Sequence, residues 1–360
     1  MTPHQNPVVM FVGGGTLGPV LPLLAVLDAL REKSPLPLRV TWVATPDGPE
    51  HLILAAEKDI EVMSLASAKL RRYWAWQNLF VPFVFIASII RAWTIVRRVR
   101  PTVVVSAGGF TAVPVHIVAW LHRIPSHVHQ QDVVVGLTNK IVAPMASSLT
   151  CAFAASKAQL PSYAAVIGNP VRADVTQGSR ARARKEWGIA EGRPVVLVLG
   201  GGLGAQTLNN AIRAGVSALT QHAHVIHVTG RGKIDTAFVH EHYTQLEFLG
   251  RAQMADAYAV ADLVVARAGM GTVSELALLR KAAILVPITS SHQEYNAQEV
   301  FRLRAGLVAT SDTVVQTACD LLRDESALAQ MRESWPGVLR TDAGMRIALM
   351  VLHIISSRGR

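Results

Sequence analysis

Three glycine-rich turns are the features of this sequence with the clearest chemical capability. The first, GGGTLGP at residues 13–19, separates the apolar run VVMFV from the helical pattern VLPLLAVLDALRE. The second is GGGLG at 200–204, and the third, AGMGT at 268–272, follows the apolar run LVVA. Glycine lets main-chain N–H groups approach a ligand closely, and a following helix adds a partly positive end. The turns predict a ligand with phosphate, such as a sugar diphosphate; the alternative is that glycine serves tight strand-to-helix turns for steric reasons alone.

Polar side chains stand at the start of two later helical patterns. Thr272-Val273-Ser274-Glu275 has the spacing of a capping box, in which Thr272 caps a helix and Glu275 reaches back to it. A carboxylate can instead accept hydrogen bonds from both hydroxyls of a ribose, which gives Glu275 a binding role. Ser291 and Glu294 allow the same kind of cap, whereas the amides of HQEYN suit the hydroxyls of a sugar. No glycine turn is followed by the Lys-Ser/Thr pair of a P-loop, which disfavours nucleoside triphosphate hydrolysis.

Residues 69–100 combine basic residues and tryptophans with an apolar stretch. The stretch from Leu79 to Ile90 carries no charge, and it is shorter than the about 20 residues that a spanning helix needs. Such a composition suits docking at an anionic membrane surface, and the alternative is a buried helix with a solvated basic face. The residues concerned are Lys69, Arg71, Arg72, Arg91, Arg97, Arg98 and Arg100, with Trp74, Trp76 and Trp93.

Length and composition limit the class of protein. A chain of 360 residues exceeds what one hydrophobic core usually serves, which predicts two domains. With 50% hydrophobic and 17% charged residues the chain is not disordered, and its formal net charge of +10 favours phosphate-bearing partners. Cys151 and Cys319 lie far apart, as expected in a reducing cytoplasm, and the sequence MTPHQNP is no secretory signal. No nucleic-acid-binding module is present, so we expect no nucleic-acid partner.

Apolar runs of strand length alternate with helical patterns along most of the chain. This alternation predicts an α/β fold with parallel sheets covered by helices on both faces. The pattern restarts at PVVLVLGGGLGAQTLNNAIRAGVSAL, residues 194–219, after a linker at roughly 160–190 that contains Pro170 and Gly178. We therefore expect a first domain at 1–165, a second at 166–341, and a last helix within 342–360 that packs back on the first. The ligand is expected at the carboxyl ends of the strands, in a cleft between the domains.

Several motifs occur in the order and approximate spacing of a known family. They are GGGTLGPVLPLLAVL, AGGFTAVPV, HQQDVVVGLTNK, VIGNPVRADV, LGGGLGAQTLN, ADLVVARAGMGTVSE and HQEYNAQ. On these motifs, over nearly its whole length, the chain resembles the peptidoglycan GlcNAc transferases that convert lipid I to lipid II, the MurG family. The resemblance implies the GT-B architecture of two Rossmann-like domains, the donor UDP-GlcNAc and an undecaprenyl-linked MurNAc-pentapeptide acceptor. It also implies no cofactor or metal, a peripheral position on the cytoplasmic face of the membrane, and a role in cell-wall synthesis, cell shape and division.

The same resemblance assigns substrate contacts to individual residues. Arg172 in GNPVR would meet the diphosphate, a task suited to a guanidinium. Leu249 would present main-chain groups to uracil, and Gln293 would bind the GlcNAc hydroxyls. The donor sugar would be lined by Thr16, Leu17 and Gly18. Phosphate and ribose would be surrounded by Gly202, through its main chain, and by Met270, Gly271, Thr272, Val273, Ser274 and Glu275.

Three departures from the family pattern concern the general base. The usual first loop GGTGGH carries a histidine where this chain has Pro19, and proline cannot move a proton. The usual HEQN is His129-Gln130-Gln131-Asp132 here, and the usual GGY is Gly108-Gly109-Phe110. The expected inverting reaction needs a base at the acceptor hydroxyl. We take Asp132 as that base and His129 as an orienting residue, with His129 as the competing base.

The same departures leave two alternative functions. One is a related GT-B transferase with another UDP-sugar or lipid acceptor. The other is a catalytically silent protein that binds a sugar nucleotide, because Pro19 and Phe110 remove expected groups. A silent protein would hold UDP-GlcNAc without releasing UDP in the presence of lipid I.

Overall fold

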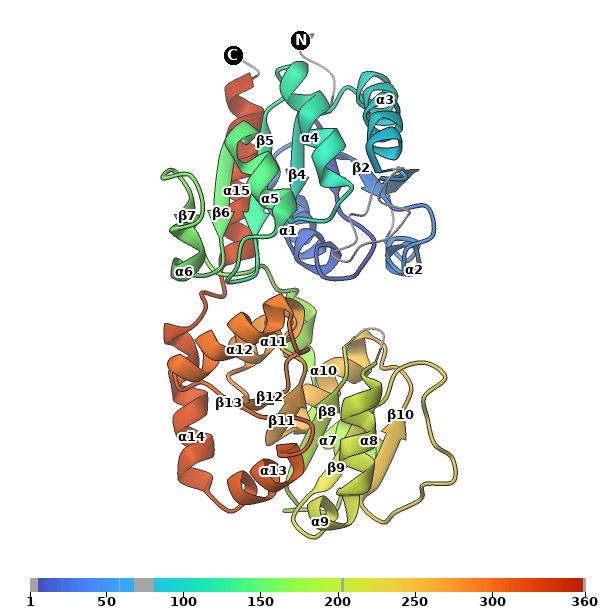
Figure 1. The fold of residues 1–360 in the computed structure, drawn as a ribbon, viewed down its shortest axis with the longest axis vertical. Coiled ribbons are helices and arrows are strands. Elements are labelled where there is room, and N and C mark those ends of the chain that lie inside the picture. The colour runs from blue at the N-terminus through green and yellow to red at the C-terminus, as the bar shows by residue number, and fades with distance from the viewer. Residues whose placement is uncertain (1–5, 58, 68–80, 202–203, 359–360) are drawn as a thin grey trace. The chain divides into compact units, whose positions relative to one another are not determined.

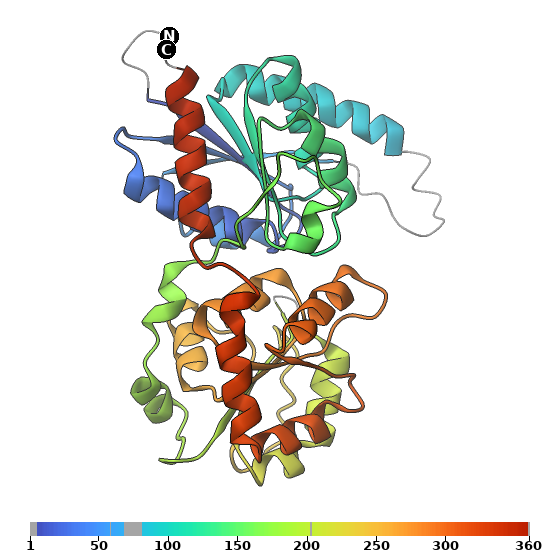
Figure 2. The same ribbon diagram turned by 90° about the vertical axis from the view of Figure 1, so that its left-hand side faces the viewer.

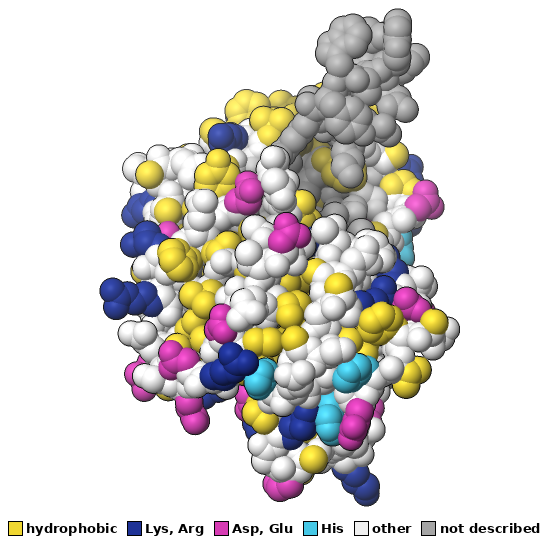
Figure 3. Space-filling view, turned by 60° about the horizontal axis from the view of Figure 1, so that its bottom comes forward, with side chains coloured by type: hydrophobic (Ala, Val, Ile, Leu, Met, Phe, Trp, Pro, Cys, Tyr) yellow, Lys and Arg dark blue, Asp and Glu magenta, His cyan; other side chains and the backbone are white. Residues whose placement is uncertain are grey.

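The computed structural model describes residues 6–57, 59–67, 81–201 and 204–358. The chain forms two compact units, Met1–Pro170 together with Asp342–Arg360, and Val171–Thr341. Figure 1 shows a parallel sheet with helices on both faces in each unit. On the face seen in Figure 3, basic, acidic and apolar side chains are intermixed, although the whole sequence carries a formal charge of +10.

The first unit is built on a seven-stranded sheet whose strand pairs are all parallel, in the order β3-β2-β1-β4-β5-β6-β7. The strands are β1 (Val8–Val12), β2 (Arg39–Ala44), β3 (Ile60–Ser64), β4 (Val103–Ser106), β5 (Ser126–Gln130), β6 (Ser148–Cys151) and β7 (Ala165–Val166). The helices are α1 (Val20–Lys33), α2 (Glu50–Leu54), α3 (Val81–Val99), α4 (Ala112–Leu121), α5 (Leu137–Val142), the 3₁₀ helix η2 (Ala143–Met145), α6 (Ala154–Lys157) and α15 (Ala343–Arg358).

The strand β1 shows why this sheet is covered on both faces. All five of its residues are buried apolar side chains, and successive side chains of a strand point to opposite faces. Val9 and Phe11 pack in one cluster with residues of α1 and α15. Met10 and Val12 pack in another with residues of α3 and α4. Figure 2 shows α15 along the sheet of this unit, with α1 beside it.

The second unit repeats the arrangement with a six-stranded parallel sheet in the order β10-β9-β8-β11-β12-β13. The strands are β8 (Val195–Leu199), β9 (His224–Val228), β10 (Tyr243–Leu246), β11 (Leu263–Ala266), β12 (Ala282–Leu285) and β13 (Leu307–Val308). The helices are η3 (Ala173–Gln177), α7 (Arg180–Glu186), α8 (Gln206–Ala214), α9 (Val216–Thr220), α10 (Arg251–Val260), α11 (Met270–Leu279), α12 (His292–Arg302), α13 (Val314–Leu322), α14 (Glu325–Ser334) and η4 (Trp335–Gly337).

The predicted α/β fold with two doubly wound parallel sheets is confirmed. In both sheets the chain order reverses beside the first strand, between β1 and β4 and between β8 and β11. Ligands of open α/β sheets bind at such switch points, outside the carboxyl ends of the strands. The region expected as a linker is more structured than its composition indicates, since Arg180–Glu186 forms α7 with Ser179 as its N-cap.

Candidate functional site

The glycine turns follow the strands that flank the switch points. The turn at 13–18 follows β1 and the turn at 200–204 follows β8, while the turn at 268–272 follows β11. A further pair, Gly108 and Gly109, follows β4 with φ angles of 99° and 89°. Each unit therefore carries two glycine turns at the place where an open sheet binds ligands.

In the second unit, the first turn of α11 is open to an acceptor. Gly269 is the N-cap, with φ −72° and ψ 141°, and supplies no side-chain cap. Among the described residues, none accepts a hydrogen bond from the main-chain N–H groups of Met270, Gly271 or Thr272. Three such groups at a helix N-terminus favour an anion. The capping box on Thr272 is wrong, because the helix begins two residues earlier at Met270.

Glu275 faces other polar groups of the same unit. Its Oε2 accepts a hydrogen bond of 2.7 Å from the hydroxyl of Tyr258, which is fully buried on α10. Burial raises the pKa of Glu275 to about 7; the Tyr258 hydrogen bond lowers it, and nearby Asp174 raises it further. The carboxylate can still accept ligand hydroxyls, because it has more acceptor sites than Tyr258 uses.

Arg172 lies at the start of η3, as its N-cap residue. Its side chain is largely buried, and its Nε lies 3.4 Å from Oδ2 of Asp174. Asp174 is also the residue whose charge acts on Glu275, so one acidic residue connects the guanidinium with the α11 region. The side chains of Val273 and Ser274 are buried, and the Ser274 hydroxyl donates to the carbonyl of Met270 at 2.5 Å. The side chains of these two residues therefore pack inside the unit, so only their main-chain atoms are candidates for ligand contact.

Gln293 lies in the first turn of α12, after the strand β12. Ser291 is the N-cap of this helix and accepts a hydrogen bond from the Gln293 N–H at 3.2 Å, which confirms the serine part of the predicted cap. The side-chain oxygen of Gln293 accepts from the N–H of Ile288, and its amide nitrogen donates to none of the described residues. Asn296 binds α12 to the carbonyl of Ala268, at the turn before α11. The start of α12 is therefore tied to the third glycine turn through Asn296, and Gln293 lies one helical turn before Asn296 on the same helix.

The loops after β8 and β10 contain the remaining predicted contacts of this unit. Gly202 lies outside the described residues. Gly204 has φ 69°, and a Cβ there would lie 2.2 Å from the carbonyl oxygen of Thr229, so this glycine is required sterically. The Leu249 side chain is buried, and no described residue hydrogen-bonds to its main-chain N–H or carbonyl. Its neighbour Phe248 is exposed and carries the guanidinium of Arg231 over its ring at 5.4 Å.

The first glycine turn differs from the turn before α11. Thr16 and Gly18 are exposed and Leu17 is half-buried, as a ligand-lining role requires. However, the Gly13 N–H donates to the carbonyl of Val43 and the Gly15 N–H to the carboxylate of Glu50. Pro19 and Pro22 have no N–H, so α1 begins with few donors for an anion. Pro19 is buried, and its Cγ would lie 3.6 Å from a Cβ added at Gly109.

The two candidates for the base differ in their surroundings. His129 on β5 is buried, and its ring nitrogens pair with the Thr150 hydroxyl at 2.9 Å and the Asn169 side-chain oxygen at 3.0 Å. Burial lowers the pKa of His129 to about 4, although the Asn169 hydrogen bond opposes this. Asp132 follows the end of β5 and is half-buried. Its carbonyl accepts hydrogen bonds from Gln130 and Ser156, which fixes the backbone of the loop.

The helix α3 carries a second apolar stripe that the sheet does not cover. Its inner side, with Ala92, Ile95 and Val96, packs in the core of the first unit. Its outer apolar residues and those of α4 and α5 are exposed: Phe83, Val84, Ile86, Ile90, Trp93, Trp120, Leu121, Leu137 and Ile141. We call these nine residues the α3–α5 apolar surface. Arg91, Arg97, Arg98 and Arg100 are exposed on or next to α3. Lys69, Arg71, Arg72, Trp74 and Trp76 lie outside the described residues.

The described residues form neither a metal cluster nor a membrane-spanning helix. Among the described residues, no group of three or more His, Cys, Asp or Glu side chains could hold a metal ion. No helix in the same part of the chain is both long and apolar enough to span a bilayer.

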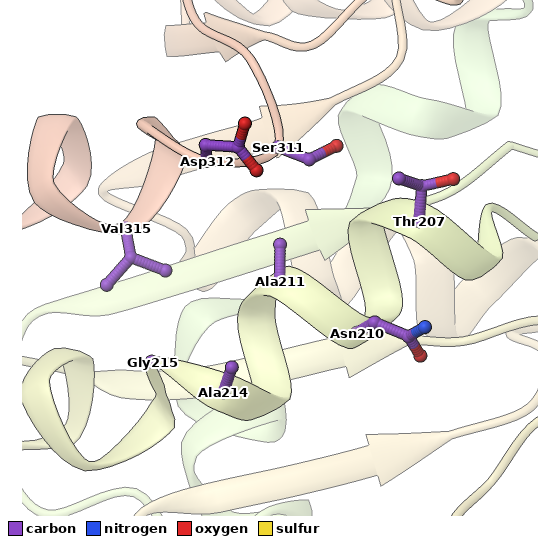
Figure 4. A pocket seen from close by; sticks show the side chains of 8 residues that line it. All are labelled: Thr207, Asn210, Ala211, Ala214, Gly215, Ser311, Asp312 and Val315. Carbon is purple, nitrogen blue, oxygen red and sulfur yellow. The ribbon is translucent and has the colours of Figure 1, made fainter.

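A hollow of about 500 Å³ between α8 and the segment before α13 is lined mainly by small side chains (Figure 4). It contains none of the predicted site residues; its lining is Thr207, Asn210, Ala211, Ala214, Gly215, Ser311, Asp312 and Val315.

Comparison with solved structures defines the class of fold. The chain superposes on a crystal structure of Acinetobacter baumannii MurG with a TM-score of 0.75, at 24% identity over 96% of this chain and 99% of that one. The calicheamicin glycosyltransferase CalG4 gives a TM-score of 0.71 at 15% identity, over 98% of this chain and 99% of that one. Two parallel doubly wound sheets with these neighbours show the GT-B fold.

Sequence comparison then identifies the family. Residues 9–150 match the glycosyltransferase family 28 N-terminal domain, and residues 195–334 match its C-terminal domain. A relative from Bacillus thuringiensis subsp. konkukian (strain 97-27) is UDP-N-acetylglucosamine–N-acetylmuramyl-(pentapeptide) pyrophosphoryl-undecaprenol N-acetylglucosamine transferase 2; it is 31% identical over 354 residues, 97% of this chain and 99% of that protein. The corresponding transferase of Geobacillus thermodenitrificans (strain NG80-2) is 33% identical over 79% of each chain. The chain belongs to the MurG family within glycosyltransferase family 28.

Proposed function

We propose that this protein transfers GlcNAc from UDP-GlcNAc to the C4 hydroxyl of MurNAc in undecaprenyl-pyrophosphoryl-MurNAc-pentapeptide, which converts lipid I to lipid II. The observation that carries the proposal is the match, over 97% of this chain and 99% of the relative, to a transferase named for these substrates. The polar groups at the switch point of the second unit support it, because they suit a nucleotide diphosphate and a sugar.

The second unit supplies the groups for the donor. The three N–H groups at the start of α11 and the guanidinium of Arg172 take the diphosphate charge, which grows on UDP as it leaves. Glu275 accepts the ribose hydroxyls, and the main chain at Leu249 pairs with uracil. The amide nitrogen of Gln293 donates to a GlcNAc hydroxyl. The turn at 13–18 of the first unit lines the sugar through Thr16, Leu17 and Gly18.

The reaction requires one proton acceptor. The C4 oxygen attacks C1 of GlcNAc on the face opposite UDP, and the C1–O bond to the β-phosphate breaks with its electron pair remaining on UDP. The C4 proton passes to the base. We assign this role to Asp132, which is half-buried at the carboxyl end of β5, because both ring nitrogens of His129 already have partners. His129 then fixes β5 to the segment that contains Asn169.

Two variants separate these roles. Asp132→Asn keeps the size of the side chain, and we expect it to lower kcat by roughly 10²-fold or more without a change in melting temperature. His129→Ala leaves Asn169 and Thr150 without their partner, and we expect it mainly to lower the melting temperature. A turnover close to that of the wild type for Asp132→Asn would exclude Asp132 as the base.

The α3–α5 apolar surface supports a peripheral position on the cytoplasmic face of the membrane. Apolar patches of this kind that border arginines suit the boundary between lipid headgroups and acyl chains. The arginines beside it suit anionic lipid headgroups. This placement brings the protein to the surface in which an undecaprenyl-linked acceptor is anchored.

One assay tests the whole proposal. Purified protein receives radiolabelled UDP-GlcNAc and lipid I, and the label is followed into the lipid fraction while released UDP is counted. Labelled lipid in equal amount to UDP is the expected result. Binding of UDP-GlcNAc without UDP release favours the silent binding protein, for which Pro19 and Phe110 are the motive. Labelled product from a different UDP-sugar or a different polyprenyl acceptor alone favours a related transferase.

A further inference from the structure

A buried carboxylate lies behind the first glycine turn. Glu50 is the first residue of α2 and its side chain is fully buried. Its two oxygens accept hydrogen bonds from the N–H of Gly15 at 3.2 and 3.1 Å. Its Oε1 also accepts from the N–H of Thr45 at 2.8 Å and from the Thr45 hydroxyl at 2.5 Å. One carboxylate therefore joins the turn after β1 to the loop after β2.

Gly14 and Gly48 lack side chains where the Glu50 carboxylate lies against the main chain. A Cβ at Gly14 would lie 2.3 Å from Oε1 of Glu50, and one at Gly48 would lie 2.0 Å from Oε2. Neither position has a positive φ angle, so the reason for glycine there is the closeness of the carboxylate and not the backbone conformation. The glycines of this turn thus have a structural purpose that does not involve a phosphate.

Both a carbonyl and an N–H group of the turn at residues 13–18 are hydrogen-bonded to side chains. The indole N–H of Trp42 donates to the carbonyl of Gly13 at 2.8 Å, while Glu50 accepts from the amide of Gly15. Gly15 has φ 84°, and a Cβ there would lie 2.6 Å from the ring of Phe110. The path of the main chain into Thr16 is therefore fixed on three sides by side chains from elsewhere in the unit.

The carboxylate keeps its charge although it is buried. Burial raises the pKa of Glu50, but the hydrogen bonds from the Thr45 hydroxyl and the nearby main-chain amides outweigh this and leave the pKa below its usual value. Among the described residues, no Lys, Arg or His lies within ion-pair distance of it. Burying a charge costs desolvation free energy unless several hydrogen bonds compensate it. The hydrogen bonds that Glu50 accepts from Gly15 and Thr45 therefore indicate that the charge has a role at this turn.

We propose that Glu50 is a positioning residue for the transfer reaction, which fixes the turn at residues 13–18 so that its far side fits the sugar of the donor. The inference rests on the proposed function, in which Thr16, Leu17 and Gly18 line that sugar. It predicts that Glu50 matters for the sugar-bearing donor and not for UDP, because the groups assigned to UDP belong to the second unit. It also predicts that the charge acts through the Gly15 amide and not by contact with substrate.

The first test compares Glu50→Gln with the wild type and with Glu32→Gln. The glutamine has nearly the same size but only one acceptor oxygen, so the bonds to Gly15 and Thr45 cannot all persist. Glu32 is an exposed residue of α1 and gives the matched control. We expect Glu50→Gln to lower kcat/KM for UDP-GlcNAc by roughly tenfold or more, while the Kd of UDP measured by calorimetry stays within about twofold. The control keeps both values.

Amide hydrogen exchange gives a readout that does not depend on activity. The N–H of Gly15 is expected to exchange about tenfold faster in Glu50→Gln than in the wild type, and no faster in Glu32→Gln. If Glu50→Gln does not fold, Thr45→Val replaces it, since this variant removes the 2.5 Å hydrogen bond and keeps the carboxylate. The same changes in smaller amount are expected.

The outcomes separate the two proposals. A wild type that transfers no label but shows fast Gly15 exchange in Glu50→Gln overturns the proposed function and leaves only the loop contact standing. A wild type that transfers label, with Glu50→Gln equal to it in kcat/KM and in Gly15 exchange, overturns the role of Glu50. A parallel loss of UDP affinity in Glu50→Gln also overturns it, because the effect then reaches the second unit.

Discussion

At the scale of single residues, the carboxylates Glu50 and Glu275 differ in their hydrogen-bond donors and therefore in their pKa values. Glu50 is buried with several donors and has a lowered pKa. Glu275 accepts a hydrogen bond from Tyr258, and burial raises its pKa to about 7. The difference follows from hydrogen bonding, because each donor favours the ionised form against the cost of burial. Glu50 is therefore suited to a fixed structural charge, and Glu275 to a carboxyl whose ionisation ligand hydroxyls can stabilise.

The raised pKa of Glu275 gives a test through stability. Between pH 4.5 and about 7 the native state binds more protons at this residue than the unfolded state, so the free energy of unfolding falls as pH rises through that window. The contribution is up to about 3 kcal/mol. Glu275→Gln removes it, so the stability advantage of this variant over the wild type is expected to be larger at pH 7.5 than at pH 5. Urea unfolding at both pH values measures the difference, with the exposed Glu191→Gln as control. An equal difference at both pH values contradicts the raised pKa.

A second residue prediction concerns the space around Glu50. Gly48→Ala adds a Cβ that would lie 2.0 Å from Oε2 of Glu50 and 2.2 Å from the Thr45 hydroxyl, so the carboxylate must move. We expect a loss of about 1–3 kcal/mol in the free energy of unfolding, from a strained or broken hydrogen bond. Gly136→Ala is the control, because nothing lies within 4 Å of its added Cβ. Equal melting temperatures for both variants would contradict the close fit of the carboxylate.

At the scale of elements, the helices that follow the glycine turns are not equivalent. The helix α11 begins with three N–H groups that no described residue accepts, whereas α1 begins beside two prolines and a turn whose Gly13 and Gly15 amides are occupied. An anion is attracted by available N–H groups and not by glycine content. The sequence pattern of a glycine turn before a helix thus has two different consequences in the two units.

The helix α3 provides the prediction at this scale. Phe83 and Ile86 belong to its exposed stripe, and each is more than half exposed. The double variant Phe83→Ser/Ile86→Ser removes apolar area worth roughly 2–4 kcal/mol on transfer to lipid, and we expect vesicles with anionic lipid to bind it at least tenfold less. The control is Leu36→Ser with Leu52→Ser, two exposed apolar residues of the same unit outside the α3–α5 apolar surface. Sedimentation with vesicles measures the bound fraction, and equal losses for both pairs would contradict a specific membrane surface.

At the scale of the whole molecule, the alternation of apolar runs and helical patterns in the sequence correctly predicts two parallel sheets covered by helices. Runs such as VVMFV are apolar at every position and form strands buried on both faces, and glycine turns mark the ends of several strands. The predicted N-cap of α11 lies three residues too late, because the Thr272-Glu275 spacing imitates a capping box while Gly269 provides the N-cap. Sequence alone does not reveal Glu50 or the partners of His129, since Gly15 and Asn169 lie 35 and 40 residues away along the chain.

Buried histidines make both units sensitive to acid. Burial lowers the pKa of His116 and His129 to about 4 and that of His127 to about 3 in the first unit. In the second unit, His224 has a pKa of about 4 and His227 of about 3, again from burial. Between pH 6.5 and these values the unfolded chain binds more protons than the native chain, so stability is present at neutral pH and is lost as pH falls. Each ring contributes at most about 3 kcal/mol where its pKa is about 4, and at most about 5 kcal/mol where its pKa is about 3.

Two buried tryptophans report on the units separately. The indole N–H of Trp42 donates to Gly13 in the first unit, and that of Trp335 donates to Lys281 at 2.6 Å in the second. In ¹⁵N-tryptophan-labelled protein, both indole N–H signals are expected at their native positions at pH 7 in low urea. As pH falls from 6.5 toward 4, the urea concentration at which each native signal is half lost is expected to decrease. His227→Gln is expected to reduce the acid sensitivity of the Trp335 signal and to leave that of Trp42 unchanged. If the urea midpoint of neither signal moves between pH 6.5 and 5, the buried rings are not neutral in the native protein.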